Sequence, residues 1–527
     1  MKTILRLIII SIVVLSGCNK DRLSEATVTI KDGVIKGTIE NSIVVFRGIP
    51  FAAPPVGDLR WKEPQPVKPW KEVLIADKFA PAPVQPRVPW MGNINMSEDC
   101  LYLNVWTPAH SSKDKLPVMV WIYGGGFANG ATSVPLYNGE NIAKNGVILV
   151  SVAYRLGALG FLAHPELSAE SANGKSGNYG LLDQLAGLKW VQKNINAFGG
   201  DPARVTIFGE SAGAESVSML CASPLAKGLF TGAISESGGS FAPVSDNREN
   251  GTYMASLKGS EQIGLEFAKR MGAGNIAELR ATPYEKWLSD PLSQMGGFWP
   301  TADGYVIDGD QYKLYSEGKY NDVNVIIGTN SDEGSVFVRA MDPKQYAESV
   351  RSVFGPLAVR ALELYPGHDS LEVYHSLSDL FRETVFAWPS YTWARLQSET
   401  GKSKVFVYYF DQFRPVSLYP GGPVRKGAAH SSELAYVFGH LKQKPDAKVT
   451  DEEQTLSDKM IKYWTNFAKS GDPNDRDILV WPVYREGMKT VMYLKGANPG
   501  PISIPNFEKL QFMNDYFKWL REKSGNR

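Results

Sequence analysis

The chain has 527 residues, a formal net charge of +1 and 43% hydrophobic residues, which together describe an ordinary globular protein able to bury a large core. The balanced charge gives no indication of a nucleic-acid or polyanionic partner. Its length alone would allow about three domains. Three cysteines, without a Cys-x-x-Cys pair or a Cys/His cluster, argue against a structural zinc site, and no motif calls for a cofactor.

The N-terminus predicts an export signal. Basic residues precede an apolar run at 7–15 that is too short to cross a bilayer, which is typical of a signal peptide, here residues 1–17. The run ends in Leu-Ser-Gly-Cys, which resembles a bacterial lipobox and implies that Cys18 is lipidated and anchors the protein to a membrane. An ordinary signal peptide with a chance cysteine is the alternative. Residues 18–26 are expected to form a polar tether, and the folded body to begin at Thr27.

Two early segments have clear strand patterns. Residues 28–37 alternate around Asp-Gly, which predicts a hairpin. Residues 117–123 form a continuous apolar run, which is typical of a strand buried on both faces. Three glycines follow at 124–126. They could let backbone N–H groups converge on a small space, as an oxyanion hole requires, or they could form a flexible loop.

The stretch around Ser211 is the most informative in the chain. A β-branched and aromatic strand at 205–208 leads into Gly-x-Ser-x-Gly, and a helix-compatible run follows. Gly209 and Gly213 lack a Cβ, so the chain can turn tightly and leave the hydroxyl exposed near a helix N-terminus. The five-residue motif also occurs by chance in loops. Its strand–turn–helix context favours a nucleophilic Ser211.

A nucleophilic serine needs a base, and the base needs an acid to orient it. A buried strand at 323–328 is followed by Asp332 and Glu333, and a carboxylate just past a strand's carboxyl end is where catalytic groups gather in α/β proteins. Residue chemistry alone does not choose between the two. Among the histidines after Ser211, His430 lies between small residues and a helical run, consistent with an exposed loop tip.

Five blocks in the sequence carry a family resemblance. They are residues 98–106, 124–127, 154–161, 177–184 and 208–214. Together they resemble the signatures of type-B carboxylesterases, the cholinesterase-like branch of the α/β-hydrolases, over about residues 27–517. The resemblance implies an α/β fold with a large, mostly parallel central sheet, N-terminal antiparallel strands and helices on both faces. It also implies one catalytic domain over residues 27–527, in place of the three that length allows.

The resemblance also implies the catalytic roles. It assigns Glu333 as the acid and His430 as the base that activates Ser211. The expected oxyanion donors are the backbone N–H groups of Gly125, Gly126 and Ala212. The resulting activity is that of a serine hydrolase that cleaves carboxylic esters through an acyl-enzyme intermediate. The rival class, a non-catalytic adhesion protein on the same fold, is disfavoured because relatives of that kind typically lose members of the triad.

Several neighbouring positions are expected around the site. By resemblance, Glu210 lines the gorge and supports the histidine, and Ser237 supports the site from behind. Phe127 and Phe337 are expected to contact substrate. Arg155 and Asp183 resemble a structural ion pair that holds a strand to the next helix, and Cys100 and Cys221 are expected to be free and buried.

Trp90 raises the question of substrate class. It stands ten positions before Cys100, where a cholinesterase tryptophan stacks on the choline ammonium. The surrounding loop is proline-rich and shorter here, and Val84 stands near the place of the cysteine that would pair with Cys100 in those relatives. Trp90 therefore indicates either a quaternary-ammonium site, as in a cholinesterase-like enzyme, or a general aromatic wall.

The sequence predicts an exported, membrane-anchored bacterial serine esterase acting on small-molecule esters, and leaves its oligomeric state open.

Overall fold

The computed structural model describes residues 22–88, 91–246, 253–294, 296–413, 425–442, 448–485 and 487–525. The predicted signal peptide, Cys18 and Trp90 lie outside these ranges. Arg22–Glu25 forms a short 3-10 turn in which Leu23 is buried against the core. The chain therefore joins the folded body a few residues before Thr27, the boundary expected from the sequence.

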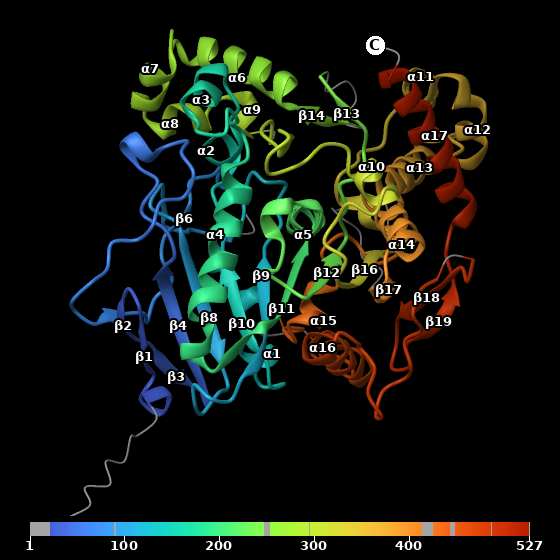
Figure 1. The fold of residues 1–527 in the computed structure, drawn as a ribbon. Helices are drawn as coiled ribbons and strands as arrows, with labels where there is room; N and C mark the ends of the chain where they lie inside the picture. The colour runs from blue at the N-terminus through green and yellow to red at the C-terminus, as the bar shows by residue number, and fades with distance from the viewer. Residues whose placement is uncertain are drawn as a thin grey trace, which may run out of the picture.

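A single eleven-stranded sheet runs through the centre of the molecule (Figure 1). In spatial order its strands are β19 (Gly500–Ser503), β18 (Thr490–Leu494), β17 (Val405–Phe410), β16 (Asn324–Asn330), β12 (Gly232–Glu236), β11 (Gly200–Glu210), β9 (Leu116–Ile122), β10 (Ile148–Val152), β8 (Tyr102–Thr107), β4 (Ile43–Pro50) and β3 (Thr38–Glu40). The strands from β18 to β10 pair in parallel, whereas β8, β4 and β3 pair antiparallel. This arrangement confirms the predicted mostly parallel sheet with antiparallel N-terminal strands. The opposite edge strand, β19, is also antiparallel.

Three small sheets flank the main one. The predicted hairpin is confirmed, because β1 (Thr27–Ile30) pairs antiparallel with β2 (Gly33–Lys36), and β5 (Leu74–Ile75) joins them. The other short strands are β6 (Ala82–Pro83), β7 (Met96–Ser97), β13 (Val244–Ser245), β14 (Met254–Ser256) and β15 (Thr301–Ala302).

Helices cover both faces of the central sheet (Figure 1). The helices are α1 (Glu140–Ala143), α2 (Gly157–Phe161), α3 (Pro165–Glu170), α4 (Tyr179–Asn194), α5 (Ala212–Ala222), α6 (Leu257–Met271), α7 (Ile276–Ala281), α8 (Tyr284–Leu288), α9 (Pro291–Gln294), α10 (Gln311–Ser316), α11 (Pro343–Phe354), α12 (Ala358–Leu364), α13 (Ser370–Arg382), α14 (Trp388–Thr400), α15 (Leu434–Val437), α16 (Asp451–Ser470) and α17 (Phe507–Gly525). Within the described ranges, none of them combines the length and the apolar character needed to cross a bilayer.

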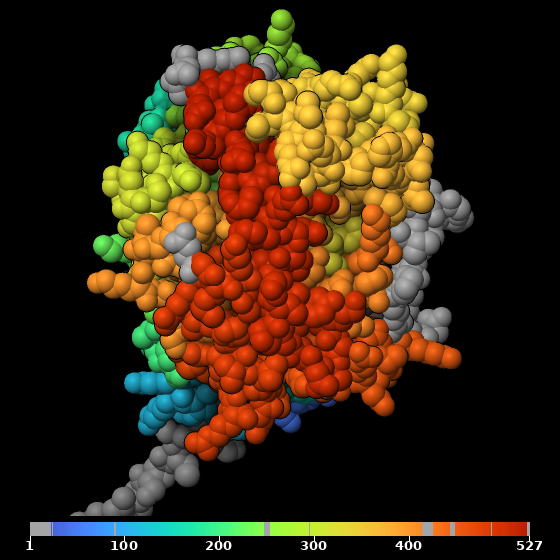
Figure 2. Space-filling view, turned by 90° about the vertical axis from the view of Figure 1, so that its right-hand side faces the viewer, coloured from blue at the N-terminus to red at the C-terminus, as the bar shows by residue number. Residues whose placement is uncertain are grey.

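Strand β17 shows why two layers of helices are needed. Its side chains alternate, so Phe406 and Tyr408 contact aromatic residues of α16, while Val407 and Tyr409 face a cavity beneath α14. Both faces of the strand are therefore apolar, as its continuous hydrophobic sequence predicts. Figure 2 shows the C-terminal part of the chain, in red, covering this edge of the molecule from top to bottom.

The predicted ion pair between Arg155 and Asp183 is confirmed and is completely buried. Asp183, on α4, accepts hydrogen bonds from Nε and Nη2 of Arg155 at 2.8 and 2.7 Å, and from its backbone N–H at 2.9 Å. The pair ties the segment after β10 to α4, as the sequence suggested. Cys100 and Cys221 are free and buried, also as expected.

Replacing Asp183 with Ala should reduce the free energy of unfolding by about 3–5 kcal/mol, because it leaves the Arg155 guanidinium buried and unpaired. Glu140→Ala is the matched control, since it breaks an ion pair whose lysine, Lys144, is half exposed, and should change stability by less than about 1 kcal/mol. Urea unfolding followed by circular dichroism measures both. Equal effects of the two substitutions would contradict the structural role of the buried pair.

Candidate active site

Ser211 occupies a strained turn between β11 and α5. Its backbone has φ 58° and ψ −125°, a region that side-chain-bearing residues rarely adopt, and α5 begins at the next residue, Ala212. The turn is possible because its neighbours lack side chains. A Cβ on Gly213 would lie 2.0 Å from the carbonyl oxygen of Ile122, and one on Gly209 would lie 2.6 Å from the same atom. The predicted strand–turn–helix around the serine is therefore present.

The glycine loop after β9 lies directly against this turn. A Cβ on Gly124 would be only 2.9 Å from Cβ of Ser211, which fixes how closely the two segments approach. Gly125 and Gly126 both have positive φ, at 110° and 62°. The N–H groups of Gly125, Gly126 and Ala212 donate to no acceptor within the described residues. Three free donors beside one hydroxyl are what an oxyanion hole requires.

Glu333 and His430 are in direct contact. Oε2 of Glu333 is 2.7 Å from Nδ1 of His430, so the neutral imidazole would carry its proton on Nδ1 and leave Nε2 as the basic atom. A parallel bridge between Asp332 and Ala429 holds the two loops together. The other carboxylate oxygen of Glu333 accepts a hydrogen bond from the Ser237 hydroxyl at 2.5 Å, so Ser237 contacts the predicted acid.

The structure separates the two carboxylates that sequence chemistry left open. Asp332 accepts hydrogen bonds from the Ser378 hydroxyl at 2.9 Å and from the N–H of Lys426 at 3.2 Å. Glu333, one residue later, is the carboxylate that reaches His430. The reason is local, because Glu333 opens a 3-10 turn after β16 and is completely buried among the site residues.

The basic atom of the imidazole faces Glu210. Nε2 of His430 is 3.1 Å from Oε1 of Glu210, and that oxygen also accepts a hydrogen bond from Ser431 at 2.5 Å. The geometry of this contact is not that of a hydrogen bond, and Nε2 has no hydrogen-bond partner. No hydrogen bond therefore joins Nε2 to the Ser211 hydroxyl in this structure. Such bonds are often formed only once substrate is bound. Because Glu210 contacts His430 and immediately precedes Ser211, His430 and Ser211 belong to one site.

Charge at the site favours the protonated imidazole. Burial alone would lower the pKa of His430, but the negative charges of Glu210 and of the hydrogen-bonded Glu333 outweigh it and raise the pKa above its ordinary value. Burial in turn raises the pKa of Glu210, while His430 and Ser431 oppose that rise. The two carboxylates that contact His430 therefore stabilise its protonated form.

Sequence reasoning missed three residues behind the triad. Glu236 and Glu433 are completely buried, and burial raises the pKa of Glu236 to about 8 and that of Glu433 well above its usual range. Asn330 donates from its backbone N–H to Glu333 at 2.6 Å and from its side chain to Glu433. The available signal was their place in the chain, because Glu236 precedes Ser237, Glu433 follows His430 by three positions and Asn330 precedes Glu333 by three. A polar residue near a site is usually interpreted as a solvated one.

Aromatic rings enclose the imidazole. Phe386 belongs to a π-helical turn, Glu383–Ala387, that joins α13 to α14. Its ring stacks on that of His430, with 4.5 Å between the ring centroids. Such single π turns are frequent at functional sites. Phe337 lies 5.1 Å from the same ring and is 48% exposed, so its expected contact with substrate is sterically possible.

Phe127 does not occupy the position expected of it. Its side chain is completely buried and packs on Phe161 and Trp299 at 5.1 and 5.2 Å, so it supports the wall of the site without facing substrate. The reason is its backbone, which turns the ring away from the loop surface with φ 56°. Trp90, the other predicted aromatic contact, lies outside the described residues.

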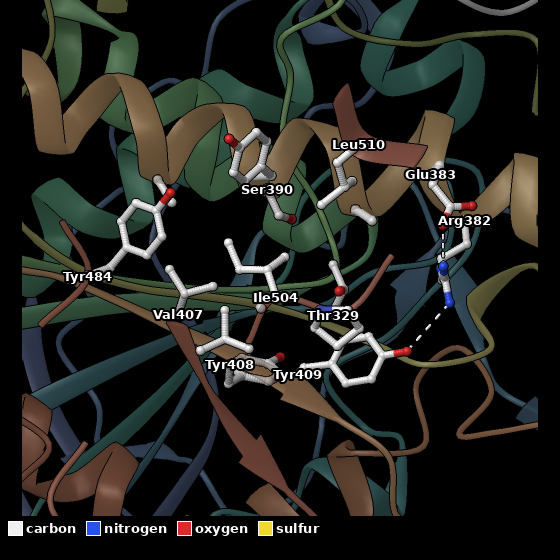
Figure 3. Close-up of a pocket in the computed structure, with 16 residues that line it drawn as sticks. Thr329, Arg382, Glu383, Ser390, Val407, Tyr408, Tyr409, Tyr484, Ile504 and Leu510 are labelled. Carbon is white, nitrogen blue, oxygen red and sulfur yellow. Dashed lines mark hydrogen bonds and ion pairs between the residues drawn. The ribbon is translucent and has the colours of Figure 1, made fainter. Parts of the chain in front are cut away.

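Two cavities differ greatly in size. One, of about 420 Å³, is lined by residues of α5, α14 and the segment around Trp299. Its volume is that of a small-molecule site. The other, of about 50 Å³, lies under α14 against Val407 and Tyr409, at the edge where Arg382 bonds Glu383 and Tyr409 (Figure 3). It has room for only a few water molecules.

The fold and the site together define an esterase of the α/β-hydrolase type. The chain belongs to the carboxylesterase family, whose sequence profile, described as "Carboxylesterase family", matches residues 24–512. A para-nitrobenzyl esterase from Bacillus subtilis (strain 168) is 37% identical over 487 residues, covering 90% of this chain and 95% of the relative. A fumonisin B1 esterase from Sphingopyxis macrogoltabida is 36% identical over 477 residues, covering 86% and 83%.

A solved structure gives the same result. A structure titled PNB esterase superimposes with a TM-score of 0.78 at 35% identity, covering 93% of this chain and all of the other. The predicted α/β-hydrolase fold is confirmed, and the protein is a carboxylic ester hydrolase.

Replacing Glu210 with Gln should move the acid limb of the pH profile of kcat/KM to lower pH. The predicted base, His430, accepts a proton only in its neutral form, and the charge of Glu210 raises the pKa of that imidazole. An uncharged amide removes the effect, so the base stays neutral at lower pH. Asp332→Asn is the matched control, because that carboxylate binds Ser378 instead. An unchanged limb in Glu210→Gln would contradict the electrostatic coupling.

Proposed function

We propose that Ser211 is the nucleophile, His430 the general base and Glu333 the residue that orients it. Ser211 Oγ attacks the ester carbonyl carbon while Nε2 of His430 takes its proton, and the carbonyl oxygen becomes an oxyanion. The N–H groups of Gly125, Gly126 and Ala212 stabilise that charge. Glu333 holds the tautomer and stabilises the imidazolium.

The tetrahedral intermediate then collapses to an acyl-enzyme, and water hydrolyses the acyl-enzyme in a second stage. The bond between the carbonyl carbon and the alcohol oxygen breaks, His430 gives its proton to the departing alcohol, and the acyl group stays on Ser211. Water attacks the acyl carbon as His430 takes one of its protons. Release of the acid returns that proton to Ser211 and restores the free enzyme.

The observation that supports this assignment most directly is the 2.7 Å contact between Glu333 and His430, beside a strained serine with free N–H donors around it. An adhesion protein on the same fold would need neither the contact nor the strain. Backbone strain persists only where the surrounding structure enforces it, and it concentrates at functional sites.

Replacing Ser211 with Ala should reduce kcat for p-nitrophenyl acetate by about 10⁴-fold or more, because no other hydroxyl occupies the turn. The variant should fold normally, since Ala lacks only Oγ. Ser289→Ala, at an exposed position at the end of α8, serves as the control and should retain full activity. Turnover of the Ser211 variant close to that of the parent would overturn the assignment.

The relatives suggest a carboxylesterase of broad specificity. Their printed names include a para-nitrobenzyl esterase, a fumonisin B1 esterase and a cholinesterase, so members with similar identity act on chemically different esters. The cavity of about 420 Å³ is lined mainly by apolar and aromatic side chains, which suits a range of substrates. A cholinesterase-like specificity built on Trp90 has no support within the described residues.

The N-terminal sequence supports a location for the enzyme. An apolar segment that ends in a lipobox-like Leu-Ser-Gly-Cys suits export followed by lipidation of Cys18, which would leave the catalytic body on the cell envelope. Only a few residues would then separate the anchor from the 3-10 turn at Arg22–Glu25, so the body would lie close to the membrane surface.

Cys18→Ala should release the enzyme from the membrane fraction when the full chain is produced in a bacterium, because the lipid acceptor is lost. Labelled palmitate should be incorporated into the parent and not into the variant. Cys100→Ala is the control, since that thiol is buried in the folded body. An unlabelled parent protein would contradict lipidation.

A further inference from the structure

Glu215 has a free carboxyl group next to the active site. It lies one turn of α5 beyond the nucleophile, and its N–H donates to the carbonyl of Ser211 at 2.9 Å. Its side chain lines the cavity of about 420 Å³ and makes no hydrogen bond or ion pair with any described residue. Glu215 is only partly exposed, and a carboxyl group largely withdrawn from solvent is normally paired, so an unpaired one that faces an empty space points to a ligand.

The cavity joins both sides of the active site. Phe381 lines it and stacks at 4.7 Å on Phe337, the ring beside His430. Trp299 also lines it and contacts Phe127 of the oxyanion loop at 5.2 Å. The cavity therefore borders rings that flank both His430 and the oxyanion loop.

The lining suits a positive charge. Aromatic rings line the cavity with the carboxyl group, contributed by Tyr253, Trp299, Phe381, Trp388 and Phe517. Among the described residues that line the cavity there is no lysine or arginine. Arg521 lies 5.9 Å from the Trp388 ring, but Asp310 pairs with it at 3.3 Å. An amine would gain both a carboxylate partner and cation–π contacts.

We propose that Glu215 is a specificity-determining residue, and that the cavity takes an arm of the ester that carries a primary ammonium group. The N–H groups of the ammonium donate to the carboxylate of Glu215, while the chain that links it to the ester lies against the rings. This inference rests on the proposed function of Ser211, because it concerns the substrate of that same site.

The charge state of Glu215 gives the preference a pH dependence. Burial raises the pKa of Glu215 to about 8, although His430 opposes the rise. The other titratable groups that share its surroundings are Tyr253, which lines the same cavity, and Tyr154, whose pKa the charge of Glu215 raises. As pH rises through about 8 the carboxyl ionises, and an aliphatic amine is still charged there. Preference for the amine should therefore increase.

The test compares esters that differ only in charge. p-Nitrophenyl 6-aminohexanoate and p-nitrophenyl heptanoate probe the acyl arm, and 6-aminohexyl acetate and heptyl acetate probe the alcohol arm. In the parent enzyme, the ratio of kcat/KM for the amino ester to that for its neutral partner should rise between pH 6.5 and 9 for one arm. Glu215→Gln should lower that ratio by about tenfold at pH 9 and make it independent of pH.

Glu236→Gln is the matched control, because it also removes a buried carboxyl whose pKa is raised to about 8, but one bonded to Trp464 and outside the cavity lining. It should leave the ratio unchanged. If Glu215→Gln alters the amino and neutral esters equally, the carboxyl acts only on His430 or on folding, and the proposal is wrong. If the parent hydrolyses none of the four esters, the proposed function fails instead.

Discussion

Parallel strand pairing is the constraint on which the whole site depends. Strands β11, β12 and β16 run side by side in the same direction, so their carboxyl ends meet at one edge of the sheet. That edge receives Ser211, Ser237 and Glu333 from three segments that are far apart in the sequence. His430 comes from the described segment 425–433, which is joined to the end of β16 by the bridge between Asp332 and Ala429.

This arrangement concentrates negative charge around a single imidazole. Glu210, Glu333 and Glu433 are all buried close to it, and Glu210 and Glu333 contact the ring directly. Burying one carboxylate is strongly unfavourable, and burying several together is more so, unless they are protonated, hydrogen-bonded or paired. Hydroxyl and amide donors from Ser237, Ser431 and Asn330 supply part of the compensation. Protonation of the deeper carboxyls supplies the rest.

Much of the fold could be predicted from the sequence, because the signals were local. The apolar runs at 117–123, 205–208 and 323–328 correspond to β9, the end of β11 and most of β16, and the Asp-Gly pattern corresponds to the β1–β2 hairpin. The contact between Glu333 and His430 follows from motif resemblance but not from residue chemistry. Asp332 and Glu333 are equivalent as acids, and only the 3-10 turn after β16 decides which one points inward.

What could not be predicted depends on side-chain direction over long distances. Phe127 was expected to face substrate because it follows the glycine loop, but a positive φ turns its ring into the core. Phe386 had no sequence signal, because it lies within a π turn that interrupts the regular helical period.

Glu215 is another side chain whose surroundings could not be predicted from the sequence. Four residues after the nucleophile, it reads in the sequence as an ordinary polar position on a helix, and helices of this kind usually turn such residues to solvent. Here α5 lies beneath other layers, so the same direction leads into an enclosed aromatic cavity. An enclosed carboxyl group without a partner is unfavourable for the free protein. Protonation lowers that penalty below a pH of about 8, and above it a group that matches the charge of the carboxylate would lower it.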